Sequence, residues 1–321
     1  MRRRTERVAR VGIMVACTLV AGCRTSEFFV ANAPNVWAPV AIHPDLAYGP
    51  DGRQTLDIIE PRRGSNHPVV IFWYGGSWVE GRKEDYRFVG VALAERGIVA
   101  VLADYRLYPA VTFPLFDEDG AAAVAWVERH ISAYGGDPHR IVLMGHSAGG
   151  HTAAFLAFNH VFLRRFGADP HDIAGLVGLS GTYEFVPDSD TLRAAFPPPY
   201  STKDWQPIQF VDSSAPPTLL LHGLADREVL PAEAVALRDA LEKAHVPVRL
   251  ELFPHRGHAD TVASFAGIAR WRTPALRDVV RFIRSVTDTV SASSLDQAPI
   301  DPHLADVGTA GVPNDLLQDV D

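Results

Sequence analysis

The stretch from residue 141 to 150, Ile-Val-Leu-Met-Gly-His-Ser-Ala-Gly-Gly, most constrains what this chain can fold into. It joins an apolar run, typical of a buried strand, to a helix-compatible stretch through the pattern G-x-S-x-G. A sharp turn from strand to helix requires Gly145 and Gly149, because a Cβ at either position would clash with the turn. The turn projects the hydroxyl of Ser147 above the sheet, next to a helix N-terminus that favours developing negative charge. The pattern therefore predicts an α/β fold with Ser147 as a nucleophile.

A serine nucleophile needs a base, and the base needs a carboxylate to orient it. Asp226 follows the apolar run 218–221, at the strand end where open α/β sheets carry catalytic loops. The nearby Glu228 is the alternative carboxylate, and as a structural residue it would be a solvated charge. His258 follows the predicted strand 248–253 and is the candidate base, with His255 as its competitor.

Donors for an oxyanion are predicted upstream, where the apolar run 68–74 ends in Gly-Gly-Ser-Trp. This segment resembles the His-Gly-Gly-Gly-Trp loop of α/β-hydrolase esterases and lipases, in the branch that includes hormone-sensitive-lipase-like and feruloyl-esterase-like enzymes. The resemblance assigns the oxyanion hole to the backbone N–H groups of Gly76, Ser77 and Ala148. Two positions depart from the family pattern. Tyr74 stands in place of its histidine, and Ser77 in place of its third glycine.

The resemblance covers roughly residues 45 to 287, and it includes two further loops at 104–109 and 134–138. It implies the α/β-hydrolase fold, with a mostly parallel, doubly wound sheet and a small cap insertion. The apolar pattern is consistent with this fold, because strands covered on both faces do not alternate polar and apolar residues. Strands are predicted at 55–59, 69–74, 98–103, 141–144, 176–179, 218–221 and 248–253, and helices at 117–134, 231–244 and 274–286.

The first residues predict export. Residues 1–10 hold five arginines and one glutamate, and the apolar run 11–21 is too short to span a bilayer but suits a signal peptide. It ends in Leu-Val-Ala-Gly-Cys, which resembles a bacterial lipobox. That resemblance implies cleavage before Cys23, lipidation of Cys23, and an extracytoplasmic protein anchored to the outer membrane or cell envelope. The alternatives are an ordinary signal peptide and an uncleaved anchor.

The predicted organisation is one catalytic domain with flanking segments. Residues 1–22 are the signal peptide, and 23–43 a tether without a clear period. The catalytic domain covers 44–290, and its segment 182–212 interrupts the sheet pattern as a cap-like insertion. Residues 291–321 carry six aspartates and no lysine or arginine, and we expect an acidic, disordered tail.

Charge and motifs exclude several functions. The net charge is −8, and it falls to near −12 without the signal peptide, which argues against nucleic acid as a partner. No H-E-x-x-H spacing or zinc-type cysteine pair occurs, so the sequence predicts no metal and no cofactor.

The leading hypothesis is a serine carboxylic-ester hydrolase that acts on a small-molecule ester through an acyl-enzyme. The alternatives are an amide hydrolase with the same triad, arylformamidase-like or a peptidase, and a non-catalytic binding module.

Overall fold

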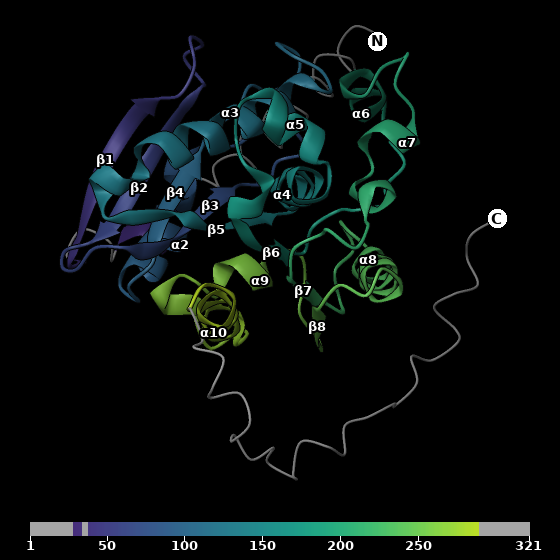
Figure 1. Ribbon diagram of the computed structural model, residues 1–321. Helices are drawn as coiled ribbons and strands as arrows, with labels where there is room; N and C mark the ends of the chain where they lie inside the picture. The colour runs from purple at the N-terminus through teal and green to yellow at the C-terminus, as the bar shows by residue number, and fades with distance from the viewer. Residues whose placement is uncertain (1–27, 34–37, 289–321) are drawn as a thin grey trace, which may run out of the picture. The chain divides into compact units, whose positions relative to one another are not determined.

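A central β-sheet organises the computed structural model, which describes residues 28–33 and 38–288 (Figure 1). In these residues the sheet has eight strands in the order β1-β2-β4-β3-β5-β6-β7-β8. Strands β3 to β8 run parallel, whereas β2 pairs antiparallel with both β1 and β4 at one edge. The strands are β1 (Val40–Ala47), β2 (Thr55–Pro61), β3 (His67–Trp73), β4 (Val99–Ala103), β5 (Gly136–His146), β6 (Ile173–Leu179), β7 (Thr218–Gly223) and β8 (Val248–Phe253).

Helices cover both faces of this sheet, which confirms the predicted fold class (Figure 1). Figure 1 shows α2 and α10 on one side and α3, α4 and α5 on the other. Strand β4 is buried at every position, and β3 and β5 are buried over their C-terminal five and six residues, because helices exclude water from both faces of the sheet. The longer helices are α2 (Arg87–Ala94), α3 (Leu115–His130), α4 (Ala148–Phe158), α5 (His160–Arg165), α8 (Pro231–Lys243) and α10 (Ala275–Thr287).

The structure corrects the predicted tether at 23–43. Residues 28–32 are helical, and the side chain of Asn32 is bound to the catalytic domain. It donates to the carbonyl of Asp85 at 2.8 Å and accepts from the N–H of Phe88 at 2.9 Å. Strand β1 then begins at Val40, inside the predicted tether. The sequence did not reveal β1 because this edge strand contains Pro44 and alternates irregularly between half-buried and exposed positions.

The segment 182–212 contains two short helices, α6 (Asp190–Ala195) and α7 (Thr202–Trp205), and the turn η5 (Pro207–Phe210). Aromatic side chains attach it to the domain. Phe196 packs edge-on against Trp78 at 4.8 Å between ring centroids, and the carbonyl of Trp205 accepts a hydrogen bond from His151 at 2.7 Å. The insertion is therefore packed next to the loop that follows β3.

Several predictions concern residues outside the described ranges. The signal peptide at 1–22, Cys23 and the acidic tail at 291–321 all belong to this group. Of the helices in residues 28–33 and 38–288, none has the length and apolar character needed to cross a membrane.

Candidate active site

Ser147 stands between β5 and α4 with φ 55° and ψ −124°, a conformation that non-glycine residues rarely adopt. The two flanking glycines permit this turn. A Cβ on Gly145 would lie 2.0 Å from the carbonyl oxygen of Gly149, and one on Gly149 would lie 2.1 Å from that of Trp73. Both neighbours are backbone atoms, which cannot move aside. The steric prediction made from G-x-S-x-G is therefore confirmed.

The Gly-Gly-Ser-Trp loop lies against this turn. A Cβ on Gly75 would be 2.8 Å from the Cβ of Ser147, so the two backbones approach closely. Gly76 has φ 137°, which favours glycine, and Ser77 adopts φ 51°. In the described part of the chain, no hydrogen bond uses the N–H of Gly76, Ser77 or Ala148. The loop after β3 and the start of α4 meet at Ser147, and together they carry these three N–H donors, which have no acceptor in the described part of the protein.

Arg53 holds the Gly-Gly-Ser-Trp loop in place, and nothing in the sequence had singled this residue out. Arg53 lies on the turn between β1 and β2, and it donates to the hydroxyl of Tyr74 at 2.6 Å and to the carbonyl of Gly81 at 2.8 Å. Its Nε also donates to the carbonyl of Tyr105 at 2.9 Å. Tyr74 and Gly81 bracket the Gly-Gly-Ser-Trp loop, so Arg53 joins both ends of it. Tyr74, which replaces the family histidine, provides the acceptor.

Asp226 and His258, both selected from the sequence, are in direct contact. Nδ1 of His258 lies 2.8 Å from Oδ2 of Asp226, although the two residues are 32 positions apart in the chain. Oδ1 of Asp226 accepts from the backbone N–H groups of Glu228 at 2.9 Å and Val229 at 3.0 Å. These two hydrogen bonds fix the orientation of the Asp226 carboxylate, so that Oδ2 points at the imidazole of His258.

The environment keeps Asp226 ionised. Burial by itself would raise the pKa of this carboxyl, but hydrogen bonds from His222 and His258 outweigh burial and hold its pKa below the usual range. Nε2 of His222 is 3.1 Å from Oδ2 of Asp226 and 3.0 Å from the carbonyl oxygen of Val229. The sequence gave no sign that His222 shares the carboxylate with His258.

A second histidine connects His258 to the serine turn. Nε2 of His146 is 3.2 Å from the carbonyl oxygen of His258, and the two rings are 4.8 Å apart. Burial, with a smaller contribution from the charge of His258, lowers the pKa of His146 to about 3, so its ring is neutral and donates from Nε2. In the described residues no hydrogen bond joins the hydroxyl of Ser147 to His258.

The competing candidates are placed differently. His255 is exposed, at φ 60°, and no hydrogen bond among the described residues joins it to Asp226. The side chain of Glu228 is 67% exposed, and its carboxylate lies 3.9 Å from Nε2 of His258. Glu228 therefore lies beside Nε2 of the imidazole, whereas Asp226 binds Nδ1. It cannot orient the ring in the way that Asp226 does.

Three carboxylates lie as close together as the ligands of a metal ion would. Asp45, Asp57 and Glu84 bring their oxygens within 4.8 Å of one another. The ammonium of Lys83 lies among them, 2.8 Å from Asp57 and 2.7 Å from Glu84, and Arg87 binds the other oxygen of Asp57 at 2.9 Å. Protein cations therefore already neutralise these carboxylates.

Known proteins resemble both the sequence and the fold. The chain is 30% identical over 239 residues to isoprenylcysteine alpha-carbonyl methylesterase of Arabidopsis thaliana, covering 67% of this chain and 56% of that protein. It is 30% identical over 260 residues to esterase LipQ of Mycobacterium tuberculosis, covering 73% and 62%. The chain thus spans less than two thirds of the length of these relatives.

A solved structure, esterase B of Lactobacillus rhamnosis, superposes with a TM-score of 0.70 at 21% identity, over 89% of this chain and 97% of that one. This likeness supports the fold, a mostly parallel sheet with flanking helices. The BD-FAE family matches residues 56–241, which is more than half of the chain. The chain therefore belongs to the BD-FAE family.

Proposed function

We propose that this protein hydrolyses carboxylic esters through an acyl-enzyme, with Ser147 as nucleophile, His258 as base and Asp226 as the orienting acid. The observation that carries the proposal is the 2.8 Å contact between His258 and Asp226, beside a strained serine turn. The relatives support an ester as substrate, because they are named as a methylesterase and an esterase.

The chemistry follows from the hydrogen bonds. The carboxylate of Asp226 accepts a hydrogen bond from Nδ1–H of His258, so Nε2 is free to accept the proton of the Ser147 hydroxyl as the oxygen attacks the ester carbonyl. The resulting imidazolium is stabilised by the adjacent carboxylate. It returns the proton to the leaving alcohol, and water then repeats the sequence in reverse to release the acid.

The oxyanion is assigned to the unused backbone donors. The N–H groups of Gly76, Ser77 and Ala148 have no protein acceptor in the described residues, and Gly75 places their loop against Ser147. Each such donor is worth roughly 3 kcal/mol of transition-state stabilisation. Arg53 would contribute indirectly, since it holds both ends of the loop that carries two of the donors.

Hydrolysis of p-nitrophenyl acetate by the purified chain tests this proposal. We expect Ser147→Ala and His258→Ala each to lower kcat by several orders of magnitude, on the order of 10⁶ for residues that act as a unit. His255→Ala is the matched control and should stay within about tenfold of the parent, since it lies outside the unit. An active His258→Ala variant would overturn the assignment of the base. Faster hydrolysis of an aryl formamide than of the matching ester would overturn the ester preference.

We also propose that Cys23 carries a lipid anchor, which would place the catalytic domain on the outer side of a bacterial membrane. The support is the sequence alone: an arginine-rich start, an apolar run at 11–21, and small residues before the cysteine. Several acyl chains at about 0.8 kcal/mol per buried CH₂ would make attachment effectively permanent. Mass spectrometry of the mature N-terminus tests this, and an unmodified amine on any other residue would contradict it.

A further inference from the structure

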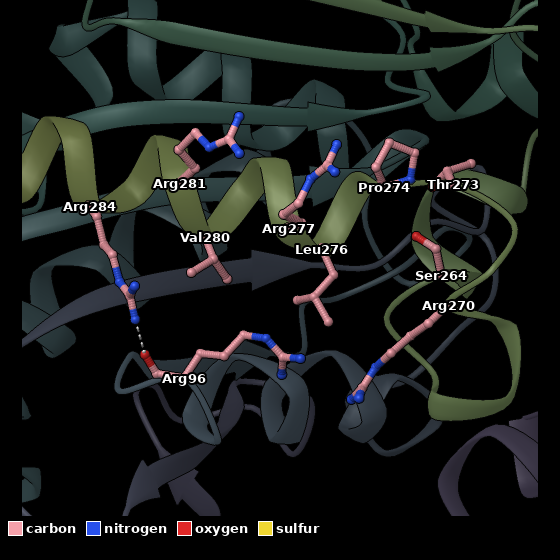
Figure 2. Close-up of a pocket in the computed structure, with 10 residues that line it drawn as sticks. All are labelled: Arg96, Ser264, Arg270, Thr273, Pro274, Leu276, Arg277, Val280, Arg281 and Arg284. Carbon is pink, nitrogen blue, oxygen red and sulfur yellow. Dashed lines mark hydrogen bonds between the residues drawn. The ribbon is translucent and has the colours of Figure 1, made fainter. Parts of the chain in front are cut away.

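An arginine-lined groove lies far along the chain from the serine turn, between α10 and the end of α2 (Figure 2). Its cavity measures about 580 Å³. Five arginines line it, with Leu276 and Val280 between them on α10 (Figure 2). The arginines are Arg96, Arg270, Arg277, Arg281 and Arg284.

Figure 2 shows how three of these arginines converge. Arg284 descends from α10 and donates to the carbonyl of Arg96 at 3.2 Å, while the guanidinium groups of Arg96 and Arg270 lie in the space below the helix. Arg277 and Arg281 extend from the opposite side of α10 in this view. Cations from three separate segments thus surround one end of the domain.

The local charge is not neutralised. Glu95 lies 3.7 Å from Arg96 and 3.5 Å from Arg270, and Asp278 lies 3.2 Å from Arg277. Two carboxylates therefore face five guanidinium groups, which leaves a net charge of +3. Burial, together with the charge of Arg270, lowers the pKa of Arg96, which is the effect expected where cations crowd. The whole chain has a net charge of −8, so this face is opposite in sign to the chain as a whole.

Exposed apolar side chains flank the same arginines. Trp271 is 72% exposed and Ile268 is 55% exposed, and both are within two residues of Arg270. The ring of Trp271 has the guanidinium groups of Arg256 and Arg272 each 5.5 Å from its centroid. Tryptophan next to arginine is the combination that favours the boundary between lipid headgroups and acyl chains. A site for a free anion alone would not require exposed Trp271 and Ile268.

We propose that this face, Arg96 with residues 268–284, docks on an anionic phospholipid surface. A headgroup phosphate would enter the groove between Arg96, Arg270 and Arg284, while Trp271 and Ile268 insert at the level of the headgroups. Basic residues on a protein surface are attracted to anionic lipids, and the attraction decays within a Debye length. The proposal does not depend on the ester hydrolysis or on the lipid anchor.

Hydrogen exchange of the full chain with vesicles tests docking locally. Cys23→Ser removes the predicted acylation site from every sample. Vesicles of phosphatidylcholine with phosphatidylglycerol should protect the backbone of residues 267–284, and vesicles of phosphatidylcholine alone should not. The N-terminal arginines are present in all samples, so they cannot account for protection in this segment.

Charge removal supplies the decisive comparison. Each basic residue near an anionic surface strengthens docking about fivefold, so the triple variant Arg270→Gln, Arg277→Gln, Arg281→Gln should shift the local docking equilibrium on the order of a hundredfold. The matched control replaces three exposed arginines elsewhere with glutamine: Arg129, Arg164 and Arg193. Protection should persist in the control, and hydrolysis should be unchanged in both variants. A Trp271→Phe variant should lose the quenching that brominated lipids produce in the parent.

Three outcomes would overturn the proposal. The first is equal protection by neutral vesicles, and the second is equal loss of protection in the control variant. The third is protection of 267–284 by inorganic phosphate or glycerol phosphate without vesicles, which would indicate a small-anion site instead of a membrane surface.

Discussion

Replacing Asp226 with asparagine would test the candidate site, because it should change which nitrogen of His258 carries the proton. The carboxylate of Asp226 has no free oxygen. Oδ1 accepts from the backbone N–H groups of Glu228 and Val229. Oδ2 accepts from Nδ1 of His258 at 2.8 Å and from Nε2 of His222 at 3.1 Å. Asparagine keeps one oxygen and presents an amide NH₂ in place of the other.

The two backbone donors decide how asparagine would be oriented. If its NH₂ faced Glu228 and Val229, two donors would lose their acceptor, at a cost of about 1–3 kcal/mol each. In the opposite orientation only His222 loses this acceptor, and it keeps the carbonyl of Val229 at 3.0 Å. The amide oxygen should therefore face the backbone, and the NH₂ should face Nδ1 of His258. A donor at that position stabilises the tautomer whose proton is on Nε2. That nitrogen can no longer accept the proton of Ser147.

We therefore expect Asp226→Asn to fold normally and to lower kcat/KM on the order of 10⁴-fold, which is about 5 kcal/mol of transition-state stabilisation. The assay is hydrolysis of p-nitrophenyl acetate, with thermal unfolding measured in parallel. Glu228→Gln is the control, because its exposed carboxylate is 3.9 Å from the other nitrogen, and it should stay within about tenfold of the parent. If Asp226→Asn retains a tenth of the activity, or if Glu228→Gln is the inactive variant, the tautomer argument fails.

Two further predictions concern stability. A Cβ on Gly149 would be 2.1 Å from the carbonyl oxygen of Trp73, so Gly149→Ala should lower the free energy of unfolding by about 3 kcal/mol in urea titration. Gly52→Ala meets no atom within 4 Å and should change it by less than about 1 kcal/mol, and equal effects would contradict the steric argument. Burial raises the pKa of Asp117 to about 8, so the folded state holds a proton that the unfolded chain releases, and stability is lost as pH rises from about 4 towards 8. Asp117→Asn carries no such proton, so the parent should lose up to about 3 kcal/mol relative to the variant between about pH 5 and pH 7, and parallel pH profiles would refute the raised pKa.

The buried strands could be predicted because the pattern that identifies each of them lies within a few neighbouring residues. All seven predicted strands are present, from β2 to β8. A strand covered on both faces, such as β4, is a continuous apolar run, whereas the edge strand β8 alternates apolar residues with Arg249 and Glu251. β1 was missed, because at the edge of the sheet one side of the strand faces solvent and the pairing with β2, from Val40 opposite Pro61 onwards, selects the strand. The tether prediction failed at Asn32 for a related reason. The side chain of Asn32 hydrogen-bonds to Asp85 and Phe88, more than fifty residues away. No local sequence pattern predicts partners at that distance.

The sequence by itself determined the serine turn and the two strand ends that carry Asp226 and His258. The turn depends on contacts within a few residues, where a Cβ at Gly145 or Gly149 meets backbone atoms, so residue types and spacing suffice to predict it. Only the tertiary structure decided which distant groups share these side chains. Arg53 reaches Tyr74 across 21 positions, and Arg96 meets Arg284 across 188, because helix packing and strand order bring them together. Charge and burial depend on that packing, which is why the arginine face became visible only in the folded chain.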